Sequence, residues 1–195
     1  MLAAGWCWPQ SAGAQAGTFV ITPVAEKKVA ELPAGALYWR IETFPTLPAA
    51  QAAASANPDA IAAAVSGKDW LFTLGPKGGS TPGGTEVAEI GPIPRITAPE
   101  YVLRINHASG PPGSKTPVHM HPGSETFYVL AGEVSEKTPD GVGRADAGQP
   151  LVGRGANTPM EVSSSGTVNL DQLVMFLLDA SKPATIPATM PPTPQ

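Results

Sequence analysis

Cysteine is almost absent from this sequence, since Cys7 is the only one among 195 residues. A single thiol excludes a disulfide framework and a cysteine-based metal site. Charged residues are also scarce, at 14% of the chain with a net charge of −4. Because nucleic-acid-binding proteins carry a basic surface, we expect no nucleic-acid partner. No apolar run reaches the roughly 18 residues that a transmembrane helix needs, so we expect no membrane partner either.

Glycine and proline, in contrast, are abundant, at 21 and 23 residues. The hydrophobic share is 42%, which is enough to form a core. A chain of this length usually folds as one domain. The composition therefore predicts a single globular domain whose secondary-structure elements are short and separated by many turns.

The two ends of the chain differ from the middle. The first charged residue is Glu26, and residues 14–16 read Ala-Gln-Ala, which is an A-x-A cleavage pattern. The positive segment that normally opens a signal peptide is missing, so residues 1–16 are interpreted as a truncated secretory signal. We expect a periplasmic or secreted protein, or a cytoplasmic one if this segment is not a signal.

Residues 181–195 form a proline-rich tail with five prolines. Proline interrupts helices and removes a donor from a central strand. The tail is therefore predicted to be a flexible or polyproline II extension.

Several short segments are rich in aromatic and β-branched residues and are bounded by glycine or proline, as is typical of strands. The last of them is apolar on both faces, which predicts a strand buried between two layers. These segments are residues 37–44, 70–74, 85–90, 101–107, 126–131, 160–163 and 171–179.

Residues 47–66 are mostly alanine. Pro48 suits the first turn of a helix, and the Asn-Pro-Asp of residues 57–59 breaks it. A second short helix is predicted over residues 60–66, with Gly67 as its C-terminal cap. We therefore expect residues 17–85 to form strands and an accessory helical segment, and residues 86–180 to form the main β-structure.

A pair of histidines carries the strongest chemical signal. His119 and His121 are two apart, so on a strand they project from the same face. The Pro-Gly-Ser of residues 122–124 is typical of a turn, which would reverse the chain and place Glu125 on the neighbouring strand. Two imidazoles and one carboxylate are the facial ligand set of non-haem iron oxygenases, and three ligands leave positions open for water or substrate. A solvated surface pair is the weaker interpretation, because the chain has only three histidines.

The residues that follow Glu125 predict the surroundings of this site. Phe127 and Val129 have the same parity as Glu125 on the strand and would share its face. The carboxylate would therefore lie in an apolar pocket that these two side chains line.

The spacing G-x5-H-x-H-x3-E-x6-G is matched at every position, by Gly113, His119, His121, Glu125 and Gly132. It resembles the first conserved motif of the cupin superfamily. The resemblance implies an all-β fold, a cupin-type jelly-roll β-barrel, here with a short Ala-rich helical segment before it. It also implies a bound divalent metal ion (Fe, Mn, Ni, Cu or Zn), a small-molecule substrate and a homodimer.

The second motif of that superfamily departs from its pattern. The best local fit places Met160 where the family has its fourth ligand, a histidine. Three roles are open for this methionine. It is a weak ligand that favours copper(I), part of the cavity wall beside a three-ligand site, or the sign of a decayed metal site in a barrel that only binds ligands.

His107 is the third histidine and the candidate catalytic residue. It shares a strand face with Leu103 and Ile105, which points it inward if that face lines the barrel. There it would support a ligand, act as a general base or replace a ligand. The alternative is a histidine at the rim that is hydrogen-bonded to backbone or solvent.

The sequence as a whole predicts a metal-dependent enzyme that acts on a small molecule, in its most concrete form an oxygenase. An isomerase or lyase would use the same ligands, with His107 as the proton shuttle. The rival class is a non-catalytic barrel that binds a small ligand or a metal.

Overall fold

The computed structural model describes residues 17–192. The predicted signal segment and Cys7 lie outside the described residues. The regular structure of the described chain is mostly strand, with one helix, so the all-β prediction is confirmed. Within residues 17–192, no helix is long and apolar enough to cross a membrane.

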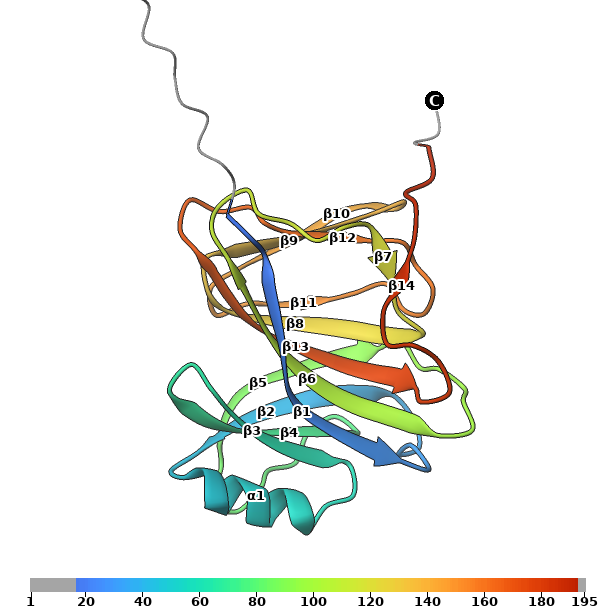
Figure 1. The fold of residues 1–195 in the computed structure, drawn as a ribbon. Helices are drawn as coiled ribbons and strands as arrows, with labels where there is room; N and C mark the ends of the chain where they lie inside the picture. Colours follow the sequence, from blue (N-terminus) through green and yellow to red (C-terminus); the bar gives the residue numbers. More distant parts are fainter. Residues whose placement is uncertain (1–16, 193–195) are drawn as a thin grey trace, which may run out of the picture.

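Three antiparallel sheets form layers, with the largest sheet in the middle (Figure 1). In spatial order, the middle sheet consists of β1 (Val20–Val29), β6 (Tyr101–Gly110), β13 (Leu170–Asp179), β8 (Gly123–Ala131) and β11 (Pro150–Val152). On one side lie β10 (Gly141–Asp146), β9 (Glu133–Thr138) and β12 (Glu161–Ser164). On the other side lie β3 (Ala60–Val65), β4 (Lys68–Gly75), β2 (Leu37–Phe44) and β5 (Thr85–Ile93).

The middle sheet and the β10-β9-β12 sheet form the jelly-roll-like half of the molecule, although their ladders do not join into a closed barrel. A further two-stranded sheet is formed by the short strand β7 (His119–Met120) and β14 (Ile186–Pro187), which lies near the C-terminus. The other half is the four-stranded sheet, and helix α1 (Leu47–Ser55) covers its outer face (Figure 1).

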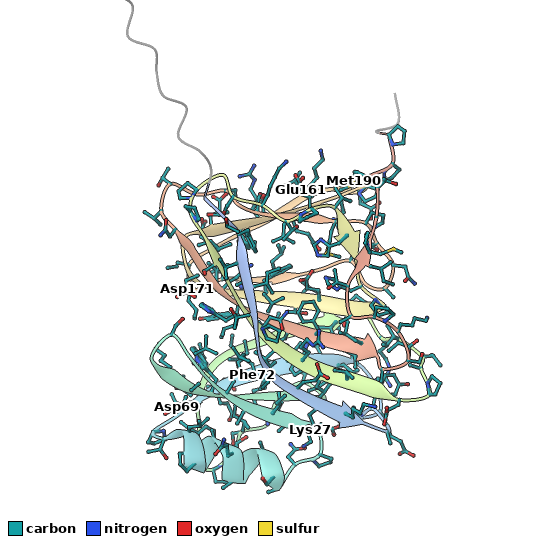
Figure 2. All side chains as sticks on the ribbon, in the orientation of Figure 1. Lys27, Asp69, Phe72, Glu161, Asp171 and Met190 are labelled. Atoms are coloured by element: carbon teal, nitrogen blue, oxygen red, sulfur yellow. The ribbon has the colours of Figure 1, made fainter. Side chains whose placement is uncertain are left out.

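Strand β13 is buried on both faces, as predicted, because it lies between two hydrophobic cores. Leu173, Met175 and Leu177 face the four-stranded sheet, in a core that includes Phe72. Val174 and Phe176 point the other way, into the core beneath β9 and β12. The alternation follows the two-residue period of a strand. In Figure 2 the labelled Phe72 lies between the middle sheet and the sheet below it.

The alanine-rich stretch forms one helix rather than two. Helix α1 begins after Thr46, whose side chain accepts from the backbone N–H of Ala49 at 3.3 Å, and it buries Ala50. The helix predicted over residues 60–66 is wrong, because those residues form β3 and pair with β4.

The β3–β4 turn shows why. Ser66 and Gly67 both have positive φ, at 49° and 71°, which is the conformation of a two-residue hairpin turn. The Trp70 indole N–H donates to the Val65 carbonyl at 3.0 Å across that turn. Gly67 is therefore a hairpin residue and not a helix cap. Pairing with β4 overrides the helix propensity of alanine, which is only a weak preference.

The expected boundary at residue 86 also differs from the structure. Strand β5 pairs with β2 and belongs to the four-stranded sheet. Strand β1, from the N-terminal segment, pairs with β6 in the middle sheet. The N-terminal segment is thus part of both halves of the molecule.

The proline-rich tail is ordered along β7 rather than extended away from the protein. Strand β14 pairs with β7, and the Ala188 N–H donates to the Val118 carbonyl at 3.2 Å. Proline is tolerated there because the β7–β14 ladder is only two residues long and lies at an edge. We call residues 182–190 the strap; for this stretch the predicted flexible extension is wrong.

Candidate metal centre

A cavity of about 320 Å³ lies between the middle sheet and the strands above it. Side chains of β6, β8 and β13 form its floor, and residues 115–119 with Val162 form its roof. Phe19 and Ile21 on one side and Thr185 and Pro187 of the strap on the other also line it. Its walls are mostly apolar, and its size is at the low end of small-molecule sites.

His119 and His121 both line this cavity, as their spacing predicts. Their rings meet edge to face with centroids 4.9 Å apart. The backbone of His119 is fixed by two hydrogen bonds to Met160, with N–O distances of 3.0 and 2.7 Å. The ring of His121 also packs on Phe176, with centroids 4.9 Å apart. Both imidazoles are therefore held in place before anything binds.

The hydrogen bonds of the two histidines determine which ring nitrogen is free. Nδ1 of His119 lies 2.8 Å from the Pro117 carbonyl oxygen, and Nδ1 of His121 lies 2.6 Å from that of Ala184. A carbonyl only accepts, so each Nδ1 carries a hydrogen and each neutral ring has its lone pair on Nε2. Metal-binding histidines are oriented in this way, and Nε2 of His121 is buried without a partner.

Glu125 reaches the same cavity from β8 and is 5% exposed. Its Oε1 is 3.8 Å from Nε2 of His121, which is beyond a hydrogen bond, and its Oε2 is buried without a partner. Burial raises the pKa of Glu125 well above 4.5, and the neighbouring Glu136 adds to this. Burial also lowers the pKa of His121 to about 4. Burial thus keeps His121 uncharged at neutral pH and disfavours the charged form of Glu125.

These residues fit a divalent first-row metal as a donor set, because two neutral imidazole nitrogens and a carboxylate are its preferred ligands. They do not form a finished cage. Within the described residues 17–192, no three His, Cys, Asp or Glu side chains lie close enough to hold an ion as they stand. A cation would favour the ionised form of Glu125 and oppose the effect of burial.

The remaining predicted site residues fall in three places. Phe127 lines the cavity. Val129 is fully buried in the core further along β8 and does not line it. Met160 is next to His119 in the backbone, but its side chain is 1% exposed in that same core and also does not line the cavity. The predicted pocket role of Val129 is therefore wrong, and Met160 lies behind the cavity surface.

His107 points away from the cavity, contrary to the prediction. Leu103 and Ile105, which share its face, belong to the core against the four-stranded sheet. Nε2 of His107 instead lies 2.7 Å from the Asp171 carboxylate, which also accepts from the Ser66 hydroxyl. Asp171 lies at the left edge of the molecule in Figure 2. Strand β6 is packed against other residues on both faces, so the apolar residues on one face did not show which face lines the cavity.

Two buried amide side chains that line the cavity, Asn106 and Gln172, were not predicted from the sequence. Both are buried amides, 8% and 1% exposed. Gln172 carried a signal, because it is a polar residue at the same parity as Val174 and Phe176 in the most apolar strand.

Asp179 fixes the chain where it leaves β13 for the strap. It accepts hydrogen bonds from the backbone N–H and the hydroxyl of Ser181, at 3.0 and 2.6 Å, and pairs with Lys182 at 3.1 Å. These partners lower the pKa of Asp179 from its ordinary 3.8, with the Ser181 hydroxyl as the largest cause. A carboxylate with a lowered pKa stabilises the fold above the ordinary pKa, and that contribution disappears as the pH falls through the folded-state pKa.

We therefore expect Asp179→Asn to destabilise the protein at pH 7 and to have progressively less effect below about pH 4. Urea unfolding of both proteins at several pH values measures this. The exposed Asp140→Asn is the control. A destabilisation that is equal at pH 7 and pH 3 would contradict the assignment.

Comparison with known proteins gives structural neighbours only. No family model and no curated protein matches the chain. The DMSP lyase DddQ from Ruegeria pomeroyi matches with 21% identity and a TM-score of 0.38, over 44% of this chain and 43% of that one. A cupin superfamily protein from Desulfitobacterium hafniense matches with 18% identity and a TM-score of 0.36, over 40% and 68%.

The polyketide cyclase RemF from Streptomyces resistomycificus matches with 20% identity and a TM-score of 0.36, over 47% of this chain and 64% of that one. The match spans less than half of the length of the DMSP lyase. In this chain the first motif lies at one cavity between two sheets of a jelly-roll-like half. The chain is similar to a solved cupin superfamily protein over 40% of its length.

Proposed function

We propose that this protein is a metal-dependent enzyme that acts on a small organic molecule, and that it is an oxygenase. His119, His121 and Glu125 would hold a divalent first-row metal. Such a metal, when bound, supplies Lewis acidity and open positions for oxygen or substrate. The proposal depends mainly on one observation: both Nδ1 atoms are bound to backbone carbonyls, which leaves the lone pair of each neutral ring on Nε2. Nε2 of His121 has no partner and lies 3.8 Å from Oε1 of Glu125, whose Oε2 is also without a partner.

The chain's own residues prepare the site in two ways. The backbone carbonyls of Pro117 and Ala184 fix the tautomer of each histidine, and Phe176 holds the ring of His121. The apolar walls keep the cavity poor in competing polar groups, which strengthens the electrostatic interactions within it. A substrate would enter past Ile21, which is 49% exposed at the cavity edge.

The position of His107 favours an oxygenase over an isomerase or lyase. The latter reactions need a group that moves a proton, and the sequence offered His107 for this role. Its side chain instead pairs with Asp171 away from the cavity. An isomerase or lyase here would need another proton carrier, either Lys115 or one of the proposed metal ligands.

The second candidate function is a non-catalytic barrel that binds a small ligand. The observation in its favour is that burial raises the pKa of Glu125 and lowers the pKa of His121, which disfavours the charged form of each. A buried pair of this kind is compatible with a cavity that binds an uncharged ligand.

The metal content of the full chain, purified without chelators, separates the two functions. We expect about one iron, manganese, nickel, copper or zinc ion per chain. The double variant His119→Ala/His121→Ala should lose it, because each ligand is a direct donor. His107→Ala is the matched control and should keep it, because His107 lies outside the cavity.

Two results would contradict the proposal. Metal content that is unchanged in the double variant would show that the ligand assignment is wrong. A wild-type protein that neither retains nor takes up these five ions would support the non-catalytic barrel. If metal is bound, oxygen uptake during turnover supports the oxygenase, whereas turnover without oxygen supports the lyase or isomerase.

A further inference from the structure

The cavity contains a second polar group, at a distance from the metal ligands. Gln172 on β13 and Asn106 on β6 both line it. Both the Oε1 and Nε2 atoms of Gln172 are buried without a hydrogen-bond partner, as is Oδ1 of Asn106. Buried amides are almost always hydrogen-bonded, and an unpaired one lowers stability. Two such amides in one cavity indicate a binding site for a ligand group.

Strand register places Gln172 at the opposite end of the cavity floor from Glu125, and it places Asn106 in the row between them. Glu125 is opposite Phe176 on β13, and Gln172 is four residues further along that strand. At about 3.3 Å per residue, the two positions are roughly 13 Å apart along the sheet. Phe127 and Val174 lie in the row between them. The floor therefore has Glu125 at one end and Gln172 at the other, and its middle row joins the apolar Phe127 and Val174 to Asn106.

The two amides are close enough to bind the same ligand group. Asn106 is directly opposite Val174, and Gln172 is two residues from Val174 on the same strand. Asn106 and Gln172 are thus diagonal neighbours on adjacent strands, a spacing of about 7–8 Å that long side chains span.

The chemistry of the amides selects the ligand group. Each carboxamide presents both a donor and an acceptor. A carboxylate would only accept and would leave the amide oxygens unpaired. The cations near the cavity are already paired: Lys115 with Glu161 at 3.0 Å, and Arg104 with Glu26. An uncharged group that donates and accepts therefore fits best.

We propose that Gln172 and Asn106 bind a hydroxyl or carboxamide group at one end of a small and otherwise apolar substrate. The apolar middle of the substrate would lie over Phe127 and Val174. Its reacting end would lie at His119, His121 and Glu125, and this last part rests on the proposed function. The substrate class is thus a neutral amphipathic molecule, and not a carboxylic acid or a phosphate.

Benzamide, benzoate and toluene are suitable test ligands, because they share one ring and differ only in the polar group. Binding to the full chain is measured by calorimetry after treatment with EDTA, so that the result does not depend on metal. We expect benzamide to bind more tightly than the other two. Gln172→Leu and Asn106→Leu should each weaken benzamide binding by about tenfold or more. The exposed Gln51→Leu is the control and should have no effect.

The same variants give a second readout, without ligand. Leucine in place of Gln172 removes unpaired buried polar atoms, so the melting temperature of the free protein should rise by about 2–4 °C. A variant that is more stable than the wild type but binds benzamide more weakly would not be expected if Gln172 had a purely structural role. Gln172→Met, which is close in shape, is the second variant if leucine does not fit.

Three results would overturn the inference. These are no detectable benzamide binding to the wild-type protein, equal binding of benzamide and benzoate, and benzamide binding that both Gln172 variants leave unchanged. The fate of the proposed function is separate. If the protein retains metal but benzamide binding does not depend on the amides, the proposed function still holds and only this inference fails. If benzamide binding depends on the amides in a protein that holds no metal, the binding site still holds and the non-catalytic barrel is supported.

Discussion

Deletion of residues 182–195 should lower the affinity of the protein for added Zn²⁺ about 10- to 100-fold, which is the usual effect of losing a group that orients a ligand. The carbonyl of Ala184 accepts the Nδ1–H of His121 at 2.6 Å, and no other partner of that nitrogen is present in residues 17–192. Without the strap, the ring loses its tautomeric preference and its fixed orientation. Strand β7, which bears His119, also loses its pairing with β14.

Competition with a chromophoric chelator measures this affinity for Zn²⁺ in the wild-type and shortened proteins. The matched control ends at Met190 and keeps both the Ala184 carbonyl and the Ala188 bond to Val118. We expect the control to bind like the full chain. Equal affinities in the full and the strap-less chain would show that the strap has no part in the site.

Gly123→Ala should destabilise the protein by at least about 1–3 kcal/mol, the usual range for overpacking a close-packed site. A Cβ atom at this position would lie 1.9 Å from the Leu177 carbonyl oxygen and 2.8 Å from Cα of Leu178. Both contacts are with the backbone of β13, so no side-chain rotation relieves them. Strand β8 would have to move away from β13, and Glu125 would move with it.

Urea unfolding gives the loss of stability, and metal content shows the displacement of Glu125. Gly75→Ala is the matched control, because a Cβ atom at the end of β4 would meet nothing within 4 Å. We expect that variant to be close to wild type. If Gly123→Ala is as stable as Gly75→Ala and keeps its metal, the close packing of β8 on β13 does not position the site.

Local patterns predicted the parts of the fold that depend on neighbouring residues. Strand β2 was predicted with its observed bounds, and β13 was predicted as a strand buried on both faces. His119, His121 and Glu125 were predicted to share a site, and all three line one cavity, although within residues 17–192 they do not lie close enough to hold an ion as they stand. These features need only the geometry of a strand and a turn.

Predictions that required knowledge of what lies across a strand failed. Residues 60–66 were predicted as helix, although pairing with β4 makes them a strand. His107 was predicted to face the site, but β6 packs on both faces and its apolar face belongs to the other core. The tail was predicted as a flexible extension, because nothing in its own sequence shows that β7 offers it a partner.

The sequence by itself indicated a β-rich chain whose two imidazoles and one carboxylate line one cavity, because period, turn chemistry and spacing are local properties. The tertiary structure alone decided which face of each strand meets the cavity, that the Ala184 carbonyl holds His121, and that two buried amides line the same floor. These depend on contacts between residues distant in sequence, which the pairing of whole sheets creates.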